Sequence, residues 1–346
     1  MPSASIINHP SSLINPTGSP LGKPYEFTEN LLTVKTPSPI IFYLCQGLRP
    51  CQPALETIYE RQENLFLSPP ARDRFPAVTT GNAMSRVAKV QFTDYPASIA
   101  RALDLIGADE ALPREGLIII KPNLTNSSPP PVTTSVAAAE AVYQYCRSRT
   151  KAEIIIGEGA GSGRTCDVFA ALGYVDMARR RRIKLVDFND AETVELERPD
   201  ALQLKTFHLP VVARDAFIIS LPVLKDHDFS KTTISMKNMF GLAPGKYYAG
   251  GWNKSKLHSP SVDDAIVDIC LYKKPALSIV DASVALQGGH LSGRKKHLGL
   301  ILAGFDPVAV DAVGSKLLGH DPAWVHYLTS AEGRLGSMRN TELVTA

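Results

Sequence analysis

The residues best suited to chemistry in this sequence gather between positions 221 and 241. Lys225 and His227 follow an apolar run directly, and Lys237 and Asn238 come shortly afterwards. Lysine ammonium groups stabilise negative charge, and a histidine, with an ordinary pKa of about 6.5, transfers protons near neutral pH. We therefore predict a site for a small anion, bound by Lys225, Lys237 and Asn238, with His227 as proton donor or acceptor.

The same segment carries signals for a short helix. Ser230 is a residue type favoured at helix N-caps, and Gly241 is a type favoured just beyond helix ends. A helix between them would place Thr233 and Lys237 on one face. We therefore predict Thr233 as a further ligand contact.

Charge sets this region apart from the rest of the chain. The full sequence has a formal net charge of +3, whereas residues 225–258 alone hold six lysines and two acids. Such a cluster suits an anionic ligand; a solvated basic face is the alternative, which buried lysines would contradict. The small total charge favours no nucleic-acid partner.

Residues 244–260 mix glycines with aromatic side chains, which is typical of a flexible flap over a pocket.

Polar residues at the ends of apolar runs add further candidates. Lys121 and Asn123 follow the run that ends at Ile120, and Asp281 follows a later apolar run. In open α/β sheets, ligands bind beyond the carboxyl ends of the strands. We predict that Lys121 and Asn123 contact the ligand and that Asp281 is a carboxylate partner of His227, with His290 or a cation as the other partners open to Asp281. Ordinary turn-stabilising roles are the alternative.

A glycine-rich loop follows the run that ends at Ile156. Gly157 and Gly159 flank Glu158, and such a loop can bring backbone N–H groups close to an anion. The loop matches neither the P-loop nor the dinucleotide-binding pattern, and Glu158 would repel a phosphate unless a cation intervened. We predict that Gly157 and Gly159 contact the substrate and that Glu158 acts as acid, base or carboxylate partner; tight-turn use is the alternative.

The elements that must position these residues alternate short β-branched runs with amphipathic segments. This pattern predicts a three-layer α/β fold, in which helices flank a mostly parallel sheet. Strands are expected at residues 86–92, 117–120, 153–156, 183–187, 216–221, 277–280 and 298–302. Helices are expected at residues 134–148, 165–181 and 322–334 and from the Asp306 cap to Gly319, with Asp311 on the helix surface.

The first 83 residues differ from the rest in composition and in hydrophobic periodicity. They hold 12 of the 26 prolines and no sustained periodicity, so we expect a disordered N-terminal extension, with an ordered regulatory arm as the alternative. Residues 84–346 are expected to form the α/β domain, either as one body or as two lobes with the site between them.

Cysteine spacing and hydropathy bear on cofactors and on cellular location. The five scattered cysteines show neither a CxxC spacing nor a ferredoxin-type run, so no metal or iron–sulfur site is predicted and the cofactor is unknown. No apolar stretch is long enough to span a bilayer, and no signal peptide is evident, so we expect a cytoplasmic protein without a membrane partner. The residues leave the oligomeric state open.

Six of these segments occur in the order typical of a known family. Over residues 84–340 the sequence resembles domain of unknown function 362, a resemblance that implies an α/β fold and no settled reaction. Some relatives carry a cysteine-rich ferredoxin-like module, which this chain lacks, and the order of the blocks is also loosely similar to the lactate racemase family. The segments are Lys121–Thr125, Gly157–Gly159, Leu221–His227, Met236–Gly241, Val280–Ala282 and Gly304–Asp311.

Three functions are compatible with these residues. The leading hypothesis is an enzyme of isomerase or lyase type that moves a proton on a small anionic metabolite. The second is a non-catalytic carrier or sensor that binds an anion or a cofactor through the same residues. The third is a cation-dependent enzyme with Glu158, Asp226, Asp281 and His227 as ligands.

Overall fold

A ten-stranded mixed sheet forms the centre of the fold. The computed structural model describes residues 84–251 and 253–346, so the predicted N-terminal extension lies outside the described residues. The strands run in the order β12–β1–β11–β10–β7–β2–β3–β4, with β8 beside β10 and β9 beside β8. Their bounds are β1 Ser85–Gln91, β2 Leu117–Pro122, β3 Glu153–Glu158, β4 Lys184–Asp187, β7 Phe217–Leu221, β8 Val223–His227, β9 Lys231–Thr233, β10 Leu277–Gln287, β11 Arg294–Gly304 and β12 Thr341–Thr345.

Most neighbouring strands in this sheet are parallel. The pairs among β4, β3, β2, β7 and β10 are parallel, whereas β11 is antiparallel to both β10 and β1. Along β2, Ile118 and Ile120 enter one apolar cluster and Ile119 enters another, so both faces of the sheet are covered. This arrangement confirms the predicted three-layer α/β fold.

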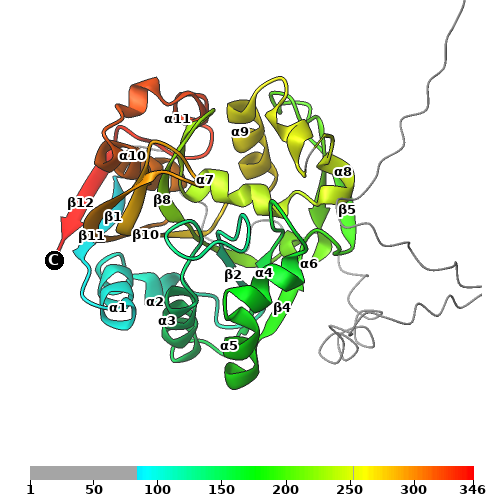
Figure 1. Ribbon diagram of the computed structural model, residues 1–346. Coiled ribbons are helices and arrows are strands. Elements are labelled where there is room, and N and C mark those ends of the chain that lie inside the picture. Colours follow the sequence, from blue (N-terminus) through cyan, green and yellow to red (C-terminus); the bar gives the residue numbers. More distant parts are fainter. Residues whose placement is uncertain (1–83, 252) are drawn as a thin grey trace, which may run out of the picture. The chain divides into compact units, whose positions relative to one another are not determined.

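Helices cover the two faces of the sheet (Figure 1). The helices α1, α3 and α5 pack over the face of Ile118 and Ile120, and α9 and α11 pack over the face of Ile119. The described helices are α1 Tyr95–Leu105, α2 Ala108–Ala111, α3 Val136–Arg147, α4 Thr165–Ala171, α5 Tyr174–Arg181, α6 Val211–Arg214, α7 Ser235–Asn238, α8 Gly245–Tyr248, α9 Val262–Tyr272, α10 Pro307–Leu318 and α11 His326–Ala331.

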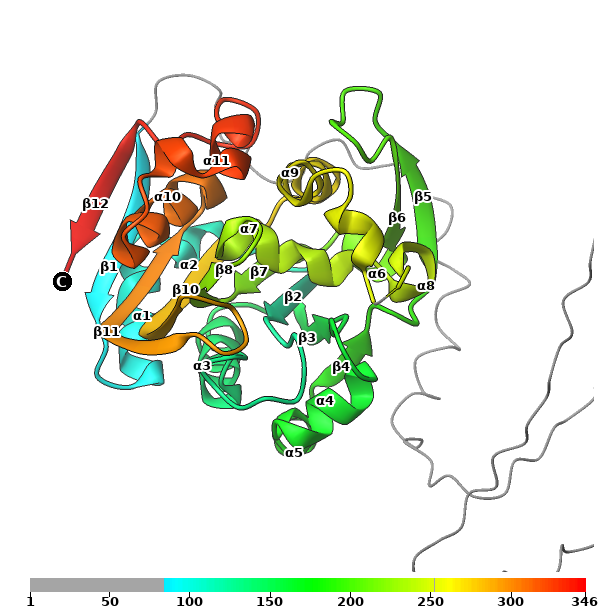
Figure 2. The ribbon, with the colours of Figure 1, turned by 45° about the horizontal axis from the view of Figure 1, so that its top comes forward.

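A separate two-stranded sheet, β5 Thr193–Glu197 and β6 Thr206–Pro210, lies next to α8 (Figure 2). Tyr248 of α8 stacks on Phe207 with ring centroids 5.5 Å apart, and its hydroxyl accepts a 2.9 Å hydrogen bond from the His208 backbone N–H. This hairpin therefore fixes one end of the predicted flap.

Two predicted helices have different bounds in the structure. The helix expected at 165–181 is interrupted at Gly173, whose φ of 80° is left-handed, and forms α4 and α5 instead. The helix expected at 322–334 is reduced to a 3₁₀ turn and α11, and the chain then ends in β12, which pairs parallel to β1. The predicted helix with the Asp306 cap and the Gly319 end is confirmed as α10.

The segment from 221 to 241 is the largest departure from prediction. The helix expected to begin at Ser230 is instead a tight hairpin of β8 and β9, and α7 begins only at Ser235. Thr233 thus lies on a strand and does not share a helix face with Lys237. The buried Asp311 carboxylate accepts the backbone N–H groups of Ser235 and Met236 at 2.8 and 3.0 Å, so its predicted surface position is wrong.

Candidate functional site

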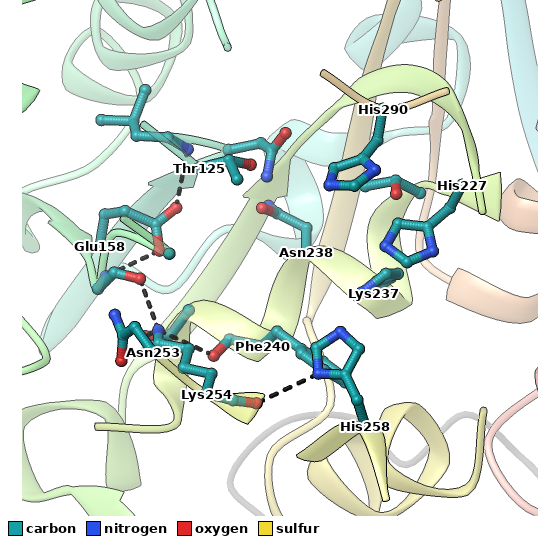
Figure 3. Close-up of a pocket in the computed structure, with 16 residues that line it drawn as sticks. Thr125, Glu158, His227, Lys237, Asn238, Phe240, Asn253, Lys254, His258 and His290 are labelled. Carbon is teal, nitrogen blue, oxygen red and sulfur yellow. Dashed lines mark hydrogen bonds between the residues drawn. The ribbon is translucent and has the colours of Figure 1, made fainter. Parts of the chain in front are cut away.

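The ends of β2, β3 and β8 meet α7 around a cavity of about 140 Å³ (Figure 3). The cavity lies beyond the carboxyl ends of parallel strands, where open α/β sheets bind their ligands. Its polar wall residues are Asn123, Thr125, Glu158, His227, Thr233, Lys237, Asn238, Asn253, Lys254, His258 and His290.

A buried ion pair joins the ends of β2 and β3. Lys121 Nζ lies 2.9 Å from both carboxylate oxygens of Glu158. Glu158 also accepts hydrogen bonds from the backbone N–H groups of Leu124 and Gly159, at 3.2 and 2.8 Å. Burial lowers the pKa of Lys121, and the Glu158 carboxylate opposes this shift. The protein itself therefore supplies the cation that Glu158 needs.

Glycines allow other segments to approach this pair. A Cβ at Gly241 would overlap the Glu158 carboxylate, which makes glycine necessary there. Gly159 lines the cavity, as its prediction as a substrate contact requires. Gly157 does not line it; a Cβ there would overlap the Phe188 ring, so its glycine serves packing.

Two asparagine side chains of the wall, Asn123 and Asn238, differ in how many of their polar atoms are hydrogen-bonded. Asn238 is fully engaged, since Oδ1 accepts from Lys121 Nζ at 3.3 Å and Nδ2 donates to Lys121 O and Ser220 Oγ, both at 3.0 Å. Asn123 Oδ1 accepts a 2.5 Å hydrogen bond from Lys225 Nζ. No hydrogen bond among the described residues involves Asn123 Nδ2, so this amide donor is open to a ligand.

His227 is held in one tautomer by its own hairpin. Its Nδ1 accepts hydrogen bonds from the backbone N–H groups of Phe229 and Ser230, at 3.1 and 3.2 Å. Burial, with the nearby charge of Lys237, lowers the pKa of His227 far below its usual range, so the ring is neutral and carries its proton on Nε2. The proton transfer predicted for His227 relied on an ordinary pKa, whereas this environment favours a hydrogen-bond donor.

Two further histidines stand beside His227 (Figure 3). The His290 ring is stacked on His227 with centroids 4.4 Å apart, and the His258 centroid lies 6.5 Å from that of His227. Burial lowers the pKa of both rings, that of His258 to about 4. This side of the cavity is therefore lined by uncharged imidazoles at neutral pH.

Lys237 differs from the other buried lysines of the described chain. It is 7% exposed, and Nζ lies 4.2 Å from the centroid of the Phe240 ring. Among residues 84–251 and 253–346, no hydrogen bond or ion pair involves Lys237 Nζ. Burial lowers its pKa to about 7, an effect that the charge of Asp263 opposes. Ammonium and amine are both populated at neutral pH beside an open cavity.

The lysine cluster of residues 225–258 is divided between the interior and the surface. Lys254 Nζ donates hydrogen bonds to the carbonyl oxygens of Gly159 and Phe240 at 2.6 and 3.2 Å, and burial lowers its pKa to about 7. This contact holds the predicted flap against the wall; flexibility of the flap stays a prediction. Lys225, Lys237 and Lys254 are buried, which contradicts a purely solvated face, whereas Lys231, Lys246 and Lys256 are exposed.

The other predicted carboxylates lie outside the cavity wall. Asp281 accepts hydrogen bonds from the hydroxyl groups of Tyr95 and Ser283, at 2.8 and 2.6 Å, and not from a histidine. Asp226 lies 2.8 Å from His320 Nε2. The proposed cation ligands are therefore not assembled, and within the described ranges no group of three or more His, Cys, Asp or Glu side chains could hold a metal ion.

The structure brings together most of the residues singled out from the sequence. Lys121 and Lys225 stand behind the wall, and Asp281 and Gly157 lie elsewhere. Sequence reasoning missed Asn253, Lys254 and His258 as site residues, although the glycine-rich loop that carries them was recognised as a flap. It also missed the place of His290 in the wall, because nothing local relates the β10–β11 loop to the β8–β9 hairpin.

Comparison with known proteins identifies the family. The model described as domain of unknown function, DUF362, matches residues 118–316, which is more than half of the chain, so the chain belongs to this family. A thylakoid-associated protein of Synechocystis sp. is 28% identical over 223 residues, which cover 63% of this chain and 68% of that protein. Every helix in the described part of the chain is too short or too polar to cross a bilayer. The cytoplasmic location stays a prediction.

Proposed function

We propose that this DUF362 protein binds a small anionic metabolite in the cavity and exchanges a proton with it through Lys237. The observation that carries the proposal is the environment of Lys237, a buried amine that faces the cavity and has no polar partner among the described residues. A buried ammonium group without a contacting counter-charge is costly, and a bound anion would remove much of that cost.

Other groups around the cavity support an anion over a cation. His227 Nε2 and Asn123 Nδ2 are hydrogen-bond donors, and the buried Thr233 Oγ1 has no partner among the described residues. The carboxylate of Glu158 in the wall is already neutralised by Lys121. A ligand rich in acceptor oxygens would satisfy these donors, as buried polar groups require.

The pKa of Lys237 supports proton transfer. A general acid or base works best when its pKa is close to the working pH, and burial brings that of Lys237 to about 7. The protonated form of Lys237 would favour binding of a carboxylate. After Lys237 loses that proton, its amine could accept a proton from the ligand carbon next to the carboxylate. This chemistry is that of an isomerase or a lyase.

A non-catalytic anion carrier is the second candidate, and the state of Glu158 favours it. The Glu158 carboxylate accepts hydrogen bonds from Lys121 and from two backbone N–H groups, so it cannot easily act as a second acid or base. With His227 neutral, Lys237 and Lys254 would be the titrating groups of the wall, and Lys254 Nζ already donates to backbone carbonyl groups. Binding without turnover fits such a site.

The test is calorimetric titration of the full chain with acetate, pyruvate and phosphate. We expect at least one of these anions to bind, and Lys237→Met to weaken that binding. The matched control is Lys246→Met, because Lys246 is exposed and, among the described residues, its Nζ donates a hydrogen bond only to Ala191 O. Unchanged binding in Lys237→Met would refute the proposal.

A second measurement separates enzyme from carrier. Pyruvate is incubated with the protein in D₂O, and exchange of its methyl protons is followed by NMR. Exchange that is lost in Lys237→Met supports proton transfer, whereas binding without exchange supports the carrier.

A further inference from the structure

The same cavity indicates which anions it takes. We infer that Lys237 condenses with the carbonyl group of a small oxo acid and holds it as a Schiff base. This inference rests on the proposed function, since it uses the same cavity and the same lysine, and it adds the substrate class and a covalent step.

The first support is the state of the Lys237 amine. Three other buried lysines direct their Nζ hydrogens at oxygen acceptors: Lys121 at Glu158, Lys225 at Asn123 and Lys254 at backbone carbonyl groups. Lys237 instead faces an aromatic ring and the cavity. Its nitrogen can therefore lose a proton and present a lone pair without breaking a hydrogen bond, as a Schiff-base lysine must.

The second support is a pair of donors for the carbonyl oxygen. Attack by an amine turns that oxygen into an alkoxide, which needs hydrogen-bond donors already in place. His227 is fixed with its proton on Nε2, because Nδ1 accepts two backbone N–H groups. Asn123 Nδ2 is oriented by the Lys225 contact at Oδ1. Both side chains line the cavity with Lys237.

The third support is the charge around the cavity. Lys225 and Lys254 are buried, and among the described residues their Nζ groups donate hydrogen bonds to neutral oxygens only, so neither is hydrogen-bonded to a carboxylate. A carboxylate on the ligand would be attracted to both, and the unpartnered Thr233 hydroxyl would donate to it. A simple aldehyde lacks this group, which is why an oxo acid fits better.

The covalent step needs no additional reagent. The Lys237 ammonium first releases a proton to solvent, and the amine lone pair forms a bond to the carbonyl carbon while the C=O π electrons move to oxygen. The nitrogen of the adduct then releases its second proton, and two protonations of the oxygen followed by loss of water give the protonated imine. Two protons leave nitrogen and two reach oxygen, so ammonium and carbonyl yield iminium and water overall. Burial favours the first step, because it lowers the pKa of Lys237 to about 7, whereas ordinary lysines are almost entirely protonated at that pH.

Reductive trapping tests the inference directly. The full chain is incubated with pyruvate and sodium cyanoborohydride at pH 7, and the modified lysines are mapped by peptide mass spectrometry. We expect the reduced pyruvate adduct at Lys237, formed at least about tenfold faster than at the exposed Lys246. In Lys237→Arg the adduct at this position is absent, while Lys246→Arg leaves labelling of Lys237 unchanged.

Acetate separates this inference from the proposed function. Acetate carries the charge and lacks a reactive carbonyl, so its binding by calorimetry reports the anion site alone. Acetate binding that depends on Lys237, with no faster labelling of Lys237 than of Lys246, overturns the Schiff base and leaves the proposed function intact. Failure of acetate, phosphate and pyruvate to bind overturns both.

Discussion

Two buried lysines, Lys121 behind the cavity wall and Lys237 within it, have opposite environments. Lys121 Nζ contacts both oxygens of Glu158 at 2.9 Å and the Asn238 amide at 3.3 Å. Lys237 Nζ contacts only the face of the Phe240 ring among the described residues. Lys121 therefore has its polar partners within the fold, whereas we propose that Lys237 gains a polar partner from a bound ligand.

This difference shows how burial alone fails to identify a ligand contact. Both lysines are almost inaccessible, yet Lys121 is paired directly with a carboxylate, whereas Lys237 feels only the charge of Asp263 without contact. The paired lysine is expected to govern stability, and the unpaired lysine is expected to govern binding. Three substitutions and two pH titrations test this contrast.

The largest effect is expected from Lys121→Met. It leaves the Glu158 carboxylate buried without its cation, which typically lowers the free energy of unfolding by about 3–5 kcal/mol. Denaturant unfolding measures the loss, and Lys246→Met on the surface is the control. A loss as small as that of the control would show that the ion pair does not hold the strand ends together.

The next effect concerns ligand affinity. Lys237→Met should weaken the binding of an anion by roughly 10- to 100-fold, since a hydrogen bond to a charged group is typically worth about 1.5–3 kcal/mol. Its free energy of unfolding should not fall, because no partner is left unpaired. A large loss of stability would place Lys237 with Lys121 as a structural lysine.

Gly241→Ala should disturb the Lys121–Glu158 ion pair through its carboxylate. The added Cβ would overlap the Glu158 carboxylate, and overpacking of this kind typically costs about 1–3 kcal/mol. Gly251→Ala is the matched control, because a Cβ there meets nothing within 4 Å. Equal unfolding midpoints for the two variants would contradict the close packing around the ion pair.

The smallest expected effect on stability is its dependence on pH. The folded-state pKa of Lys237 is about 7, below that of an unfolded lysine, so between pH 7 and 9 the unfolded chain binds more protons and stability rises with pH. Lys237→Met should reduce this slope by up to about 1.4 kcal/mol per pH unit. Parallel stability curves for the wild type and the variant would show that Lys237 keeps an ordinary pKa.

Anion binding should show the opposite trend with pH. The ammonium form of Lys237 binds the anion, so affinity should fall as pH rises above about 7, by up to tenfold per unit. Calorimetric titration with acetate at several pH values measures this dependence.

Part of this site could be predicted because its residues follow buried strands. The apolar runs ending at Ile120 and Ile156 form parallel neighbouring strands, so Lys121 and Glu158 both lie at the carboxyl ends of these strands. Their direct pairing was not predicted, because strand register and side-chain direction depend on the assembled sheet. The hairpin at His227 was missed because Ser230 suits a helix cap as well as a tight turn.

The sequence by itself determined the family, the α/β class and the strand ends at which polar residues collect, since hydrophobic periodicity and residue order are local properties. Only the tertiary structure decided which lysine has a counter-charge. That outcome depends on distances between segments remote in sequence, such as the 117 residues that separate Lys121 from Asn238. Desolvation follows from the same packing, and it is desolvation without a partner that sets Lys237 apart.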